Sequence, residues 1–324
     1  MKKIGLVGIY FPGAYNALHE NVPEGFELVD ALSPEAYGNL ADCEYLISRL
    51  DIDPDIINHT PRVRFWQRWG AGFDHVDLAA WGARGIPIAT CPGVNAGIVA
   101  ELAVMLMLAG YRNLLQINRD LRRGHWPRTE YFDRSFMIRG KTVGILGLGR
   151  IGKKVAALVS AFGANVIYYD IVRMTEQEEQ YGYRFVDMDT LLSESDIFTI
   201  HCPLNETTRG LIGEKEFARM KPSCMLINTA RGPIVDEDAL VHALTTGQIA
   251  TAGLDTYEKE PLPKDHPLLT LDNVVASAHA GGNTKVNDLN MVNYLYGNIV
   301  AFDRGEPLQS EQDIVNAAYL KREG

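Results

Sequence analysis

The sequence predicts an α/β protein built from two doubly wound parallel sheets, and three observations lead to that fold class. Short runs that are apolar at consecutive positions alternate with longer amphipathic runs along most of the chain. Consecutive apolar positions are typical of strands buried on both faces, as in a parallel sheet. The 324 residues suffice for two domains, each with its own core. A glycine-rich turn after such a run also lies mid-chain rather than near residue 1.

The apolar runs mark the strands, and the amphipathic runs between them mark the helices. We expect strands at residues 4–9, 45–48, 143–146, 166–169, 197–200, 225–228 and 274–276. We expect helices at residues 78–84, 98–123, 153–162, 214–220, 237–245 and 285–303.

Two of these segments imitate other classes of sequence. Residues 4–9 follow two lysines as a secretory signal would, but glycines interrupt the apolar stretch, so we interpret it as a buried strand. Residues 98–109 are nearly all apolar, but Glu101 interrupts them. The stretch is also shorter than the roughly 20 residues that span a bilayer, so a buried helix is predicted.

Composition excludes several classes of partner. The net charge of −10 argues against nucleic acid and anionic membrane surfaces, although local arginines can still bind a small anion. The four cysteines are scattered, which fits reduced thiols in a cytoplasmic protein and gives no zinc pattern. We therefore expect no metal, no nucleic acid and no membrane.

The glycine-rich turn has the layout of a dinucleotide site. Its residues are Gly147, Leu148, Gly149, Arg150, Ile151 and Gly152, between a strand-like run and a helix-like run. Asp170 closes the next apolar run, 170 − 147 = 23 residues after the first glycine. The glycines would give a tight turn, a close approach for the pyrophosphate and close helix packing, and the acid would bind ribose hydroxyls. The carboxylate favours NAD over NADP, and Arg173 weakens that preference slightly.

The mid-chain position of this turn predicts an inserted domain. Residues 97–280 would form the dinucleotide-binding domain, which has the pattern of a Rossmann fold. Residues 1–96 and 281–324 would form a second, flavodoxin-like domain for the substrate. A cleft between two such domains is where ligands commonly bind.

Polar residues follow three of the later apolar runs and predict a second site. Arg231 follows the run at 225–228, Asp255 and Glu260 follow 252–254, and His279 follows 274–276. In a parallel sheet these strand ends share one edge. A histidine can give a proton to a developing alkoxide, a carboxylate can orient it, and an arginine can hold a substrate carboxylate. The pattern therefore predicts hydride transfer to a carbonyl.

The chain resembles the D-2-hydroxyacid dehydrogenase family over nearly its whole length. Five segments carry the resemblance: 147–152, 201–204, 228–232, 253–261 and 279–284. The spacings 260 − 231 = 29 and 279 − 260 = 19 are also similar to the family's. Formate dehydrogenases of the family carry glutamine where this chain has Glu260, so a substrate that needs a protonated histidine is favoured. Because the chain stops at Gly324, we expect none of the C-terminal regulatory domains of larger phosphoglycerate dehydrogenases.

The resemblance implies roles for individual residues. Arg231, Glu260 and His279 would be the catalytic trio, and Asp255 would contact the nicotinamide amide. The other residues implied at the cofactor are Gly147, Gly149, Arg150, Ile151, Gly152, Asp170, Cys202, Pro203, Thr229, Ala230, Gly281 and Gly282. Residues 69–77 resemble a substrate loop whose backbone amides, at Ala71 and Gly72, would receive the substrate carboxylate. Asn95 and Arg49 match substrate-facing positions in some relatives.

These expectations define a leading hypothesis and two alternatives. The leading one is an NAD-dependent oxidoreductase that interconverts a D-2-hydroxy acid and its 2-oxo acid, with His279 as acid and base. Some relatives are instead NADH-sensing co-repressors with little turnover. A methyltransferase would use similar glycines but would not explain Arg231, Glu260 and His279 together. The segment 111–137, with Trp126, Tyr131, Phe132 and Phe136, resembles the family's dimer arm. Aromatic side chains on such an extension need a partner to cover them, so a homodimer is expected.

Overall fold

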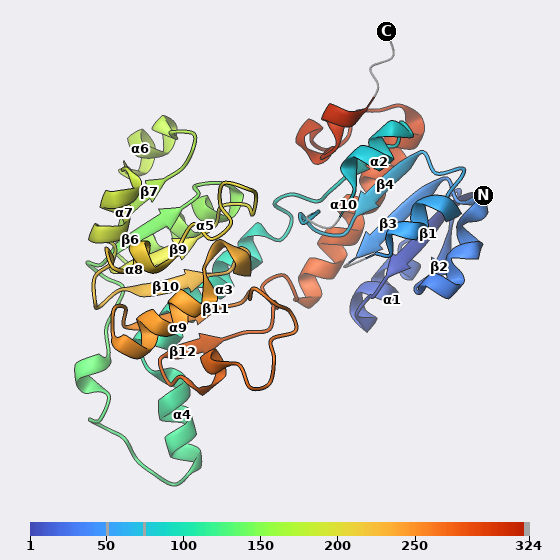
Figure 1. Ribbon diagram of the computed structural model, residues 1–324. Helices are drawn as coiled ribbons and strands as arrows, with labels where there is room; N and C mark the ends of the chain where they lie inside the picture. The colour runs from blue at the N-terminus through green and yellow to red at the C-terminus, as the bar shows by residue number, and fades with distance from the viewer. Residues whose placement is uncertain (50–51, 74–75, 321–324) are drawn as a thin grey trace. The chain divides into compact units, whose positions relative to one another are not determined.

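The computed structural model describes residues 1–49, 52–73 and 76–320 of the chain. The chain divides into two compact units (Figure 1). The first unit comprises Met1–Asn95 and Asn283–Gly324, and the second, Ala96–Gly282, is inserted within it. Both are α/β units with parallel sheets, which confirms the predicted fold class.

The first unit is built on a five-stranded sheet in the order β2-β1-β3-β4-β5, which is the flavodoxin-like order. Its strands are β1 (Lys2–Gly8), β2 (Phe26–Ala31), β3 (Tyr45–Arg49), β4 (Phe65–Arg68) and β5 (Ile88–Ala89). Helices α1 (Pro12–Glu20) and α10 (Lys285–Arg304) pack on one face, where Leu18 and Leu295 meet Ile4 and Ile47. Helix α2 (Leu78–Ala83) and the 3-10 segment Pro34–Asp42 cover the other face.

The second unit is built on a seven-stranded sheet in the order β12-β11-β10-β9-β6-β7-β8. Its strands are β6 (Thr142–Leu146), β7 (Asn165–Tyr169), β8 (Arg184–Phe185), β9 (Ile197–Ile200), β10 (Met225–Asn228), β11 (Thr251–Leu254) and β12 (Val274–Ala276). The chain order reverses between β6 and β9, which is the topological switch point at which Rossmann folds bind nucleotides.

Helices cover both faces of this sheet. On one face α3 (Ala96–Tyr111) and α5 (Arg150–Ala161) pack against a cluster that includes Ile145 and Ile227. On the other face α7 (Met188–Glu194), α8 (Glu214–Phe217) and α9 (Glu237–Thr246) pack against Phe198 and Leu226. Helix α6 (Thr175–Tyr181) has no buried residue. The buried strands explain why their sequences are apolar at consecutive positions.

The expectation of one helix over residues 98–123 is wrong. Helix α3 ends at Tyr111, and α4 (Leu114–Arg122) leaves it at an angle of 62°. Asn113 sits between them with a left-handed backbone (φ 48°), which asparagine tolerates better than most residues. Its side-chain amide donates to the backbone carbonyl of Arg134 at 2.9 Å, so the segment after α4 stabilises the break. No single helix in the described part of the chain is long and apolar enough to cross a membrane. Helices α3 and α4 reach that length and composition only when taken together, as a bent pair.

Candidate active site

The carboxyl ends of β10, β11 and β12 lie side by side in register. Asn228 pairs with Leu254, and Leu254 pairs with Ala276. Arg231, Asp255 and His279 each follow one of these strand ends within a few residues. The parallel register therefore collects them at one edge of the sheet, as the sequence pattern predicts for strands of this kind.

Glu260 and His279 form a direct pair. Oε2 of Glu260 lies 2.7 Å from Nδ1 of His279, and Oε1 accepts a hydrogen bond from the Tyr257 N–H at 3.0 Å. The two side chains are 35% and 50% exposed, so the pair is accessible to a ligand. A carboxylate that holds Nδ1 fixes the ring and leaves Nε2 for proton transfer.

The electrostatics of the pair favour an ionised carboxylate. Burial alone would raise the pKa of Glu260. The hydrogen bonds from His279 and from the Tyr257 amide, with the charge of Arg231, outweigh burial and hold that pKa below its ordinary value. Glu260 is therefore a negative partner for the histidine throughout the neutral range.

The backbone that carries His279 is unusual and is held by Asp255. His279 has a left-handed φ of 51°, and its N–H donates to the Asp255 carbonyl at 2.8 Å. The buried Asp255 carboxylate accepts the N–H groups of Ala280 and Gly281 at 2.8 and 2.9 Å. Three hydrogen bonds to one residue thus fix the loop, and the resemblance-based role of Asp255 at the nicotinamide stays a prediction.

Arg231 lies on a tight turn after β10. The buried side chain of Asn228 accepts the Ala230 N–H at 3.1 Å and donates to the Arg231 carbonyl at 3.0 Å. The Arg231 guanidinium donates to the Ala230 carbonyl at 2.8 Å. A Cβ on Gly232 would lie 2.0 Å from the carbonyl oxygen of Tyr257, so only glycine lets this turn pack against the Glu260 loop.

The glycine turn fits a dinucleotide. Gly147 has a φ of 93°, and a Cβ there would meet the backbone of Cys202 at 2.7 Å. A Cβ on Gly152 would lie 2.1 Å from the Gly147 carbonyl oxygen. A Cβ on Gly149, the N-cap of α5, would meet nothing within 4 Å. Open space of this kind at the N-terminus of a helix can admit a pyrophosphate.

Asp170 faces this turn from the end of β7. Its Oδ2 accepts the Leu148 N–H at 2.7 Å, and its Oδ1 accepts the Val172 N–H at 3.2 Å. Arg173 is engaged elsewhere, because it pairs with Glu178 at 2.7 Å and stacks on Phe185. A carboxylate thus lies where the sequence predicts the ribose contact.

Two buried polar atoms just after neighbouring strand ends have no hydrogen-bond partner among the described residues. They are Nδ1 of His201 and Oγ1 of Thr229. Both follow strand ends, of β9 and β10. Orphaned atoms of this kind are expected where a polar ligand completes the site. Burial raises the pKa of the neighbouring Cys202 thiol to about 11, so it is neutral there. Arg150 and Pro203 are exposed, while Ile151, Ala230 and Gly282 are half-buried and Gly281 is buried.

The remaining predicted site residues belong to the first unit. Arg49 ends β3 and is only 9% exposed; its guanidinium lies 4.2 Å from the Phe11 ring centre, and burial lowers its pKa. Ala71 is exposed, and the Gly72 carbonyl accepts a hydrogen bond from Arg68 at 3.0 Å. Asn95 is half-buried. Asp74 and His75, within the predicted substrate loop, lie outside the described residues.

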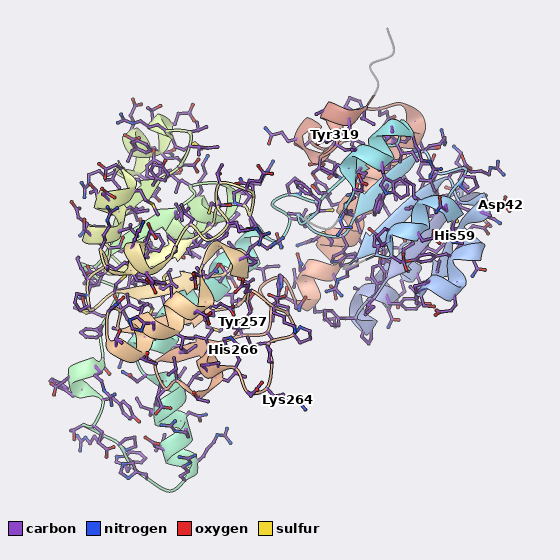
Figure 2. The ribbon with its side chains drawn as sticks, in the orientation of Figure 1. Asp42, His59, Tyr257, Lys264, His266 and Tyr319 are labelled. Atoms are coloured by element: carbon purple, nitrogen blue, oxygen red, sulfur yellow. The ribbon has the colours of Figure 1, made fainter. Side chains whose placement is uncertain are left out.

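Sequence reasoning missed two buried residues that support the pair. Tyr257, labelled in Figure 2, and Glu237 are 7% and 8% exposed and contact the Glu260 loop. The apolar pattern gave no signal for Glu237, because an acid in the first turn of a helix ordinarily faces solvent. Tyr257 is indistinguishable in sequence from a core aromatic residue.

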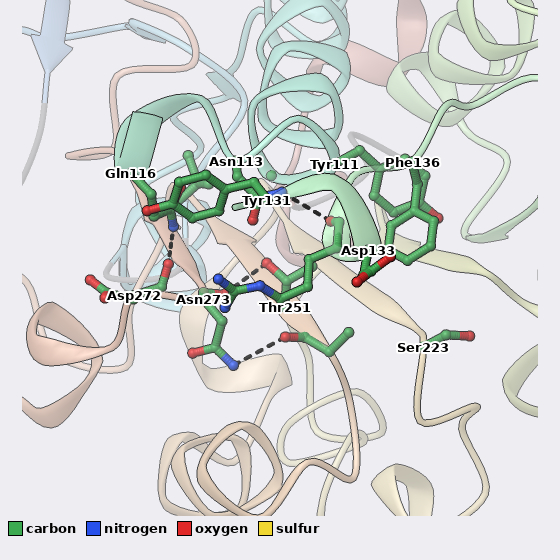
Figure 3. Close-up of a pocket in the computed structure, with 14 residues that line it drawn as sticks. Tyr111, Asn113, Gln116, Tyr131, Asp133, Phe136, Ser223, Thr251, Asp272 and Asn273 are labelled. Carbon is green, nitrogen blue, oxygen red and sulfur yellow. Dashed lines mark hydrogen bonds between the residues drawn. The ribbon is translucent and has the colours of Figure 1, made fainter. Parts of the chain in front are cut away.

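A cavity of about 460 Å³ lies at the opposite edge of the same sheet (Figure 3). Ser223, Thr251 and Asn273, at the amino ends of β10, β11 and β12, line one side, and Tyr111 and Phe136 line another. It is therefore separate from the strand ends that carry His279. The described residues contain no group of three side chains placed to hold a metal ion.

Comparison with known proteins places the chain in a family. The family described as "D-isomer specific 2-hydroxyacid dehydrogenase, NAD binding domain" matches residues 104–281. A glyoxylate reductase of Korarchaeum cryptofilum is 38% identical over 280 residues, covering 85% of this chain and 84% of that protein. A D-3-phosphoglycerate dehydrogenase of Archaeoglobus fulgidus is 40% identical over 263 residues, which cover 81% of this chain but only 50% of that protein.

A solved structure agrees with these matches. The NADPH-dependent glyoxylate/hydroxypyruvate reductase of Sinorhizobium meliloti, crystallised with NADP and malonate, has a TM-score of 0.82 at 27% identity. The alignment covers 99% of each chain. On this evidence the chain belongs to the D-isomer specific 2-hydroxyacid dehydrogenase family.

Proposed function

We propose that the chain is an NAD-dependent oxidoreductase that interconverts a D-2-hydroxy acid and its 2-oxo acid. The observation that carries the proposal is the Glu260–His279 pair, at 2.7 Å, in the same unit as a dinucleotide fingerprint. The charge of Arg231 acts on Glu260, so a cation lies close to the pair. Acid, base and cation are the groups that reduction of a charged carbonyl compound requires.

Each residue has a distinct task in the proposed reaction. The nicotinamide, when bound, supplies a hydride for reduction and accepts one in oxidation. Arg231 holds the substrate carboxylate through its guanidinium. In reduction His279 gives the proton on Nε2 to the carbonyl oxygen, and in oxidation it takes the hydroxyl proton. Glu260 holds Nδ1 and stabilises the charged ring.

The cofactor is proposed to be NAD. Gly147, Gly149 and Gly152 would hold the pyrophosphate against the N-terminus of α5, and Asp170 would bind the ribose hydroxyls. A carboxylate at that position repels a 2′-phosphate. The S. meliloti relative uses NADPH, so this preference is a property to be measured for the present chain.

The substrate is proposed to be a 2-oxo acid bound with help from the first unit. Residues 1–96 and 281–324 would form the substrate domain, and residues 97–280 the NAD domain. Backbone amides at Ala71 and Gly72 would receive the substrate carboxylate, and Asn95 and Arg49 would face the rest of the molecule. Relatives named as glyoxylate reductases make glyoxylate and hydroxypyruvate the first candidates.

Two further properties, the oligomeric state and the cellular location, complete the proposal. We propose a homodimer, because the segment 111–137 exposes aromatic side chains such as Trp126 and Phe132. We propose a cytoplasmic location, because all four cysteines are free thiols.

The test is NADH oxidation with a panel of 2-oxo acids, in the wild type and in His279→Ala. The panel comprises glyoxylate, hydroxypyruvate, pyruvate, 2-oxoisocaproate, phenylpyruvate and 3-phosphohydroxypyruvate, each repeated with NADPH. We expect turnover of at least one acid with NADH. Loss of the proton donor should lower kcat by about 10²- to 10⁴-fold.

Exposed His242 on α9 provides the matched control, since His242→Ala removes an imidazole that has no assigned role in the reaction. That variant should keep wild-type kcat. Wild-type turnover by His279→Ala would contradict the assigned proton donor. Tight NADH binding without turnover of any acid would instead support a sensing role.

A further inference from the structure

The loop that carries Glu260 is anchored by two buried groups that the proposed reaction does not use. Tyr257 lies three residues before Glu260, and Glu237 begins α9, six residues after Arg231. Both side chains are nearly inaccessible, at 7% and 8% exposure. A buried hydroxyl and a buried carboxylate beside a reactive pair call for an explanation, since each is costly without partners.

Tyr257 bonds to Glu260 and to the backbone just before His279. Its backbone N–H donates to Oε1 of Glu260 at 3.0 Å, which leaves Oε2 to face His279. Its phenolic hydroxyl donates to the carbonyl of Ser277 at 2.8 Å. Ser277 follows β12 directly and precedes His279 by two residues. One residue therefore connects the carboxylate to the strand end that carries the histidine.

The hydroxyl of Tyr257 is a constant donor. Burial, with the nearby carboxylates of Asp255 and Glu237, raises the pKa of Tyr257 to about 12. The phenol therefore stays protonated through the neutral range, so its bond to Ser277 does not depend on pH there. The Arg231 turn also packs on this residue, because Gly232 approaches the Tyr257 carbonyl too closely for a side chain.

Glu237 fixes the next residue of the loop. Its Oε1 accepts the Glu258 N–H at 2.6 Å, and its Oε2 lies 3.4 Å from Nε2 of His266. Nδ1 of His266 accepts the Leu268 N–H at 3.4 Å, so the ring proton of a neutral His266 is on Nε2 and faces the carboxylate. Tyr257 and His266 both carry labels in Figure 2. The loop is thus held on one side by α9 and on the other by β12.

We propose that Tyr257 is a positioning residue that ties the Glu260 loop to the His279 strand end, with Glu237 clamping the loop from α9. This inference rests on the proposed function, because it assigns the origin of the alignment on which proton transfer depends. Removing the tie frees Glu260 to move relative to His279, and misplacement of about 1 Å in a catalytic group can cost about 10²-fold in rate.

The test is Tyr257→Phe, which removes one oxygen and keeps the ring. We expect kcat for 2-oxo acid reduction to fall by roughly 3- to 100-fold, the upper bound being that misplacement cost. The KM for NADH should stay unchanged. The acid limb of the kcat/KM profile should move to higher pH, because a looser bond to His279 lets the pKa of Glu260 return toward its ordinary value. The Glu237 carboxylate faces two N–H donors, those of Glu258 and His266. Glu237→Gln would place an amide NH₂ against one of them, so kcat and the acid limb should change as in Tyr257→Phe.

Tyr111→Phe is the matched control. It also removes a buried hydroxyl that donates to a backbone carbonyl of the same unit, that of Asp196 at 3.2 Å. If Tyr257 only stabilised the fold, both variants would lose thermal stability and neither would shift the acid limb. A wild-type kcat and acid limb in Tyr257→Phe would overturn the proposal.

A second readout is independent of turnover. The Glu260 carboxyl carbon can be titrated by NMR in protein labelled with ¹³C-glutamate, with Glu260→Gln for assignment. The carboxyl should titrate at higher pH in Tyr257→Phe than in the wild type or Tyr111→Phe. If the wild type reduces no 2-oxo acid, the proposed function fails, and this titration still decides whether Tyr257 sets the Glu260–His279 pair.

Discussion

At the scale of residues, Asp255 explains how His279 keeps a backbone that side chains rarely adopt. A left-handed φ at a residue other than glycine costs on the order of 1–3 kcal/mol. The Asp255 carbonyl and carboxylate accept three successive N–H groups, those of His279, Ala280 and Gly281. These three bonds hold the strained backbone in place. The strained residue is also the one proposed to transfer the proton.

Asp170 carries a prediction on cofactor choice. Its carboxylate already lies 2.7 Å from the Leu148 amide of the glycine turn, where the ribose is proposed to bind. In Asp170→Ala the ratio of kcat/KM for NADPH to that for NADH should rise at least about tenfold, since juxtaposed like charges cost several kcal/mol. Steady-state kinetics with both cofactors measure this ratio.

The control for that experiment is Asp238→Asn, which neutralises an exposed acid on α9. It should leave the ratio unchanged. An unaltered ratio in Asp170→Ala would remove Asp170 from the ribose site.

His201 carries a prediction on pH. Burial lowers its pKa to about 3, and its Nδ1 has no partner among the described residues. The folded state therefore keeps the ring neutral, while the unfolded chain takes up a proton below the ordinary value of 6.5. Stability is thus lost as the pH falls from 6.5 toward 3, and the unfolding constant rises by up to about tenfold per pH unit from this group.

Urea unfolding at pH 7.5 and pH 5 tests the assignment in protein without cofactor. His201→Asn should lose less stability between these pH values than the wild type. His242→Asn, which changes an exposed histidine, should follow the wild type. Equal pH dependence of the unfolding free energy in all three proteins would show that His201 can be protonated in the folded state without loss of stability.

At the scale of elements, each of the seven expected strands is present, because burial on both faces leaves a direct signature in sequence. Strands β2, β4, β5 and β8 and helices α1, α6 and α7 were not expected. The runs at 197–200, 225–228 and 274–276 coincide with β9, β10 and β12. The break between α3 and α4 left no such signature, because apolar residues continue across Asn113 from a buried helix into one with no buried residue. The break is stabilised by a hydrogen bond from Asn113 to the Arg134 carbonyl, 21 residues away in sequence.

The same distinction applies to the site. Arg231, Glu260 and His279 stand out in the sequence because polar residues after apolar runs are conspicuous. Tyr257 and Glu237 do not, because their roles rest on contacts with Ser277 and Glu258 that only the folded loop creates. Spacing predicts which residues reach a strand end, whereas the groups that hold them there depend on tertiary packing.

At the scale of the whole molecule, the segment 111–137 leaves large apolar side chains exposed in a single chain. Trp126, Phe132 and Met137 are 75%, 79% and 66% exposed, and no residue of α4 is buried. Yet the segment is fixed to its own unit, since Arg119 pairs with Asp272. Within the segment, the Tyr131 hydroxyl donates to Asp120 at 2.6 Å. An ordered element with this much exposed apolar surface is typical of an interface between subunits.

The corresponding prediction is that the wild type is a dimer and that Trp126→Glu with Phe132→Glu is a monomer. Two carboxylates in place of aromatic rings would have to be desolvated in the interface without partners, which opposes association. Sedimentation velocity over a range of concentrations distinguishes the two states. Tyr181→Glu, an equal change at a 53% exposed residue of α6, should leave the dimer intact. If the wild type sediments as a single chain at every concentration, the exposed aromatic residues of this segment need another partner, and the site must function within one chain.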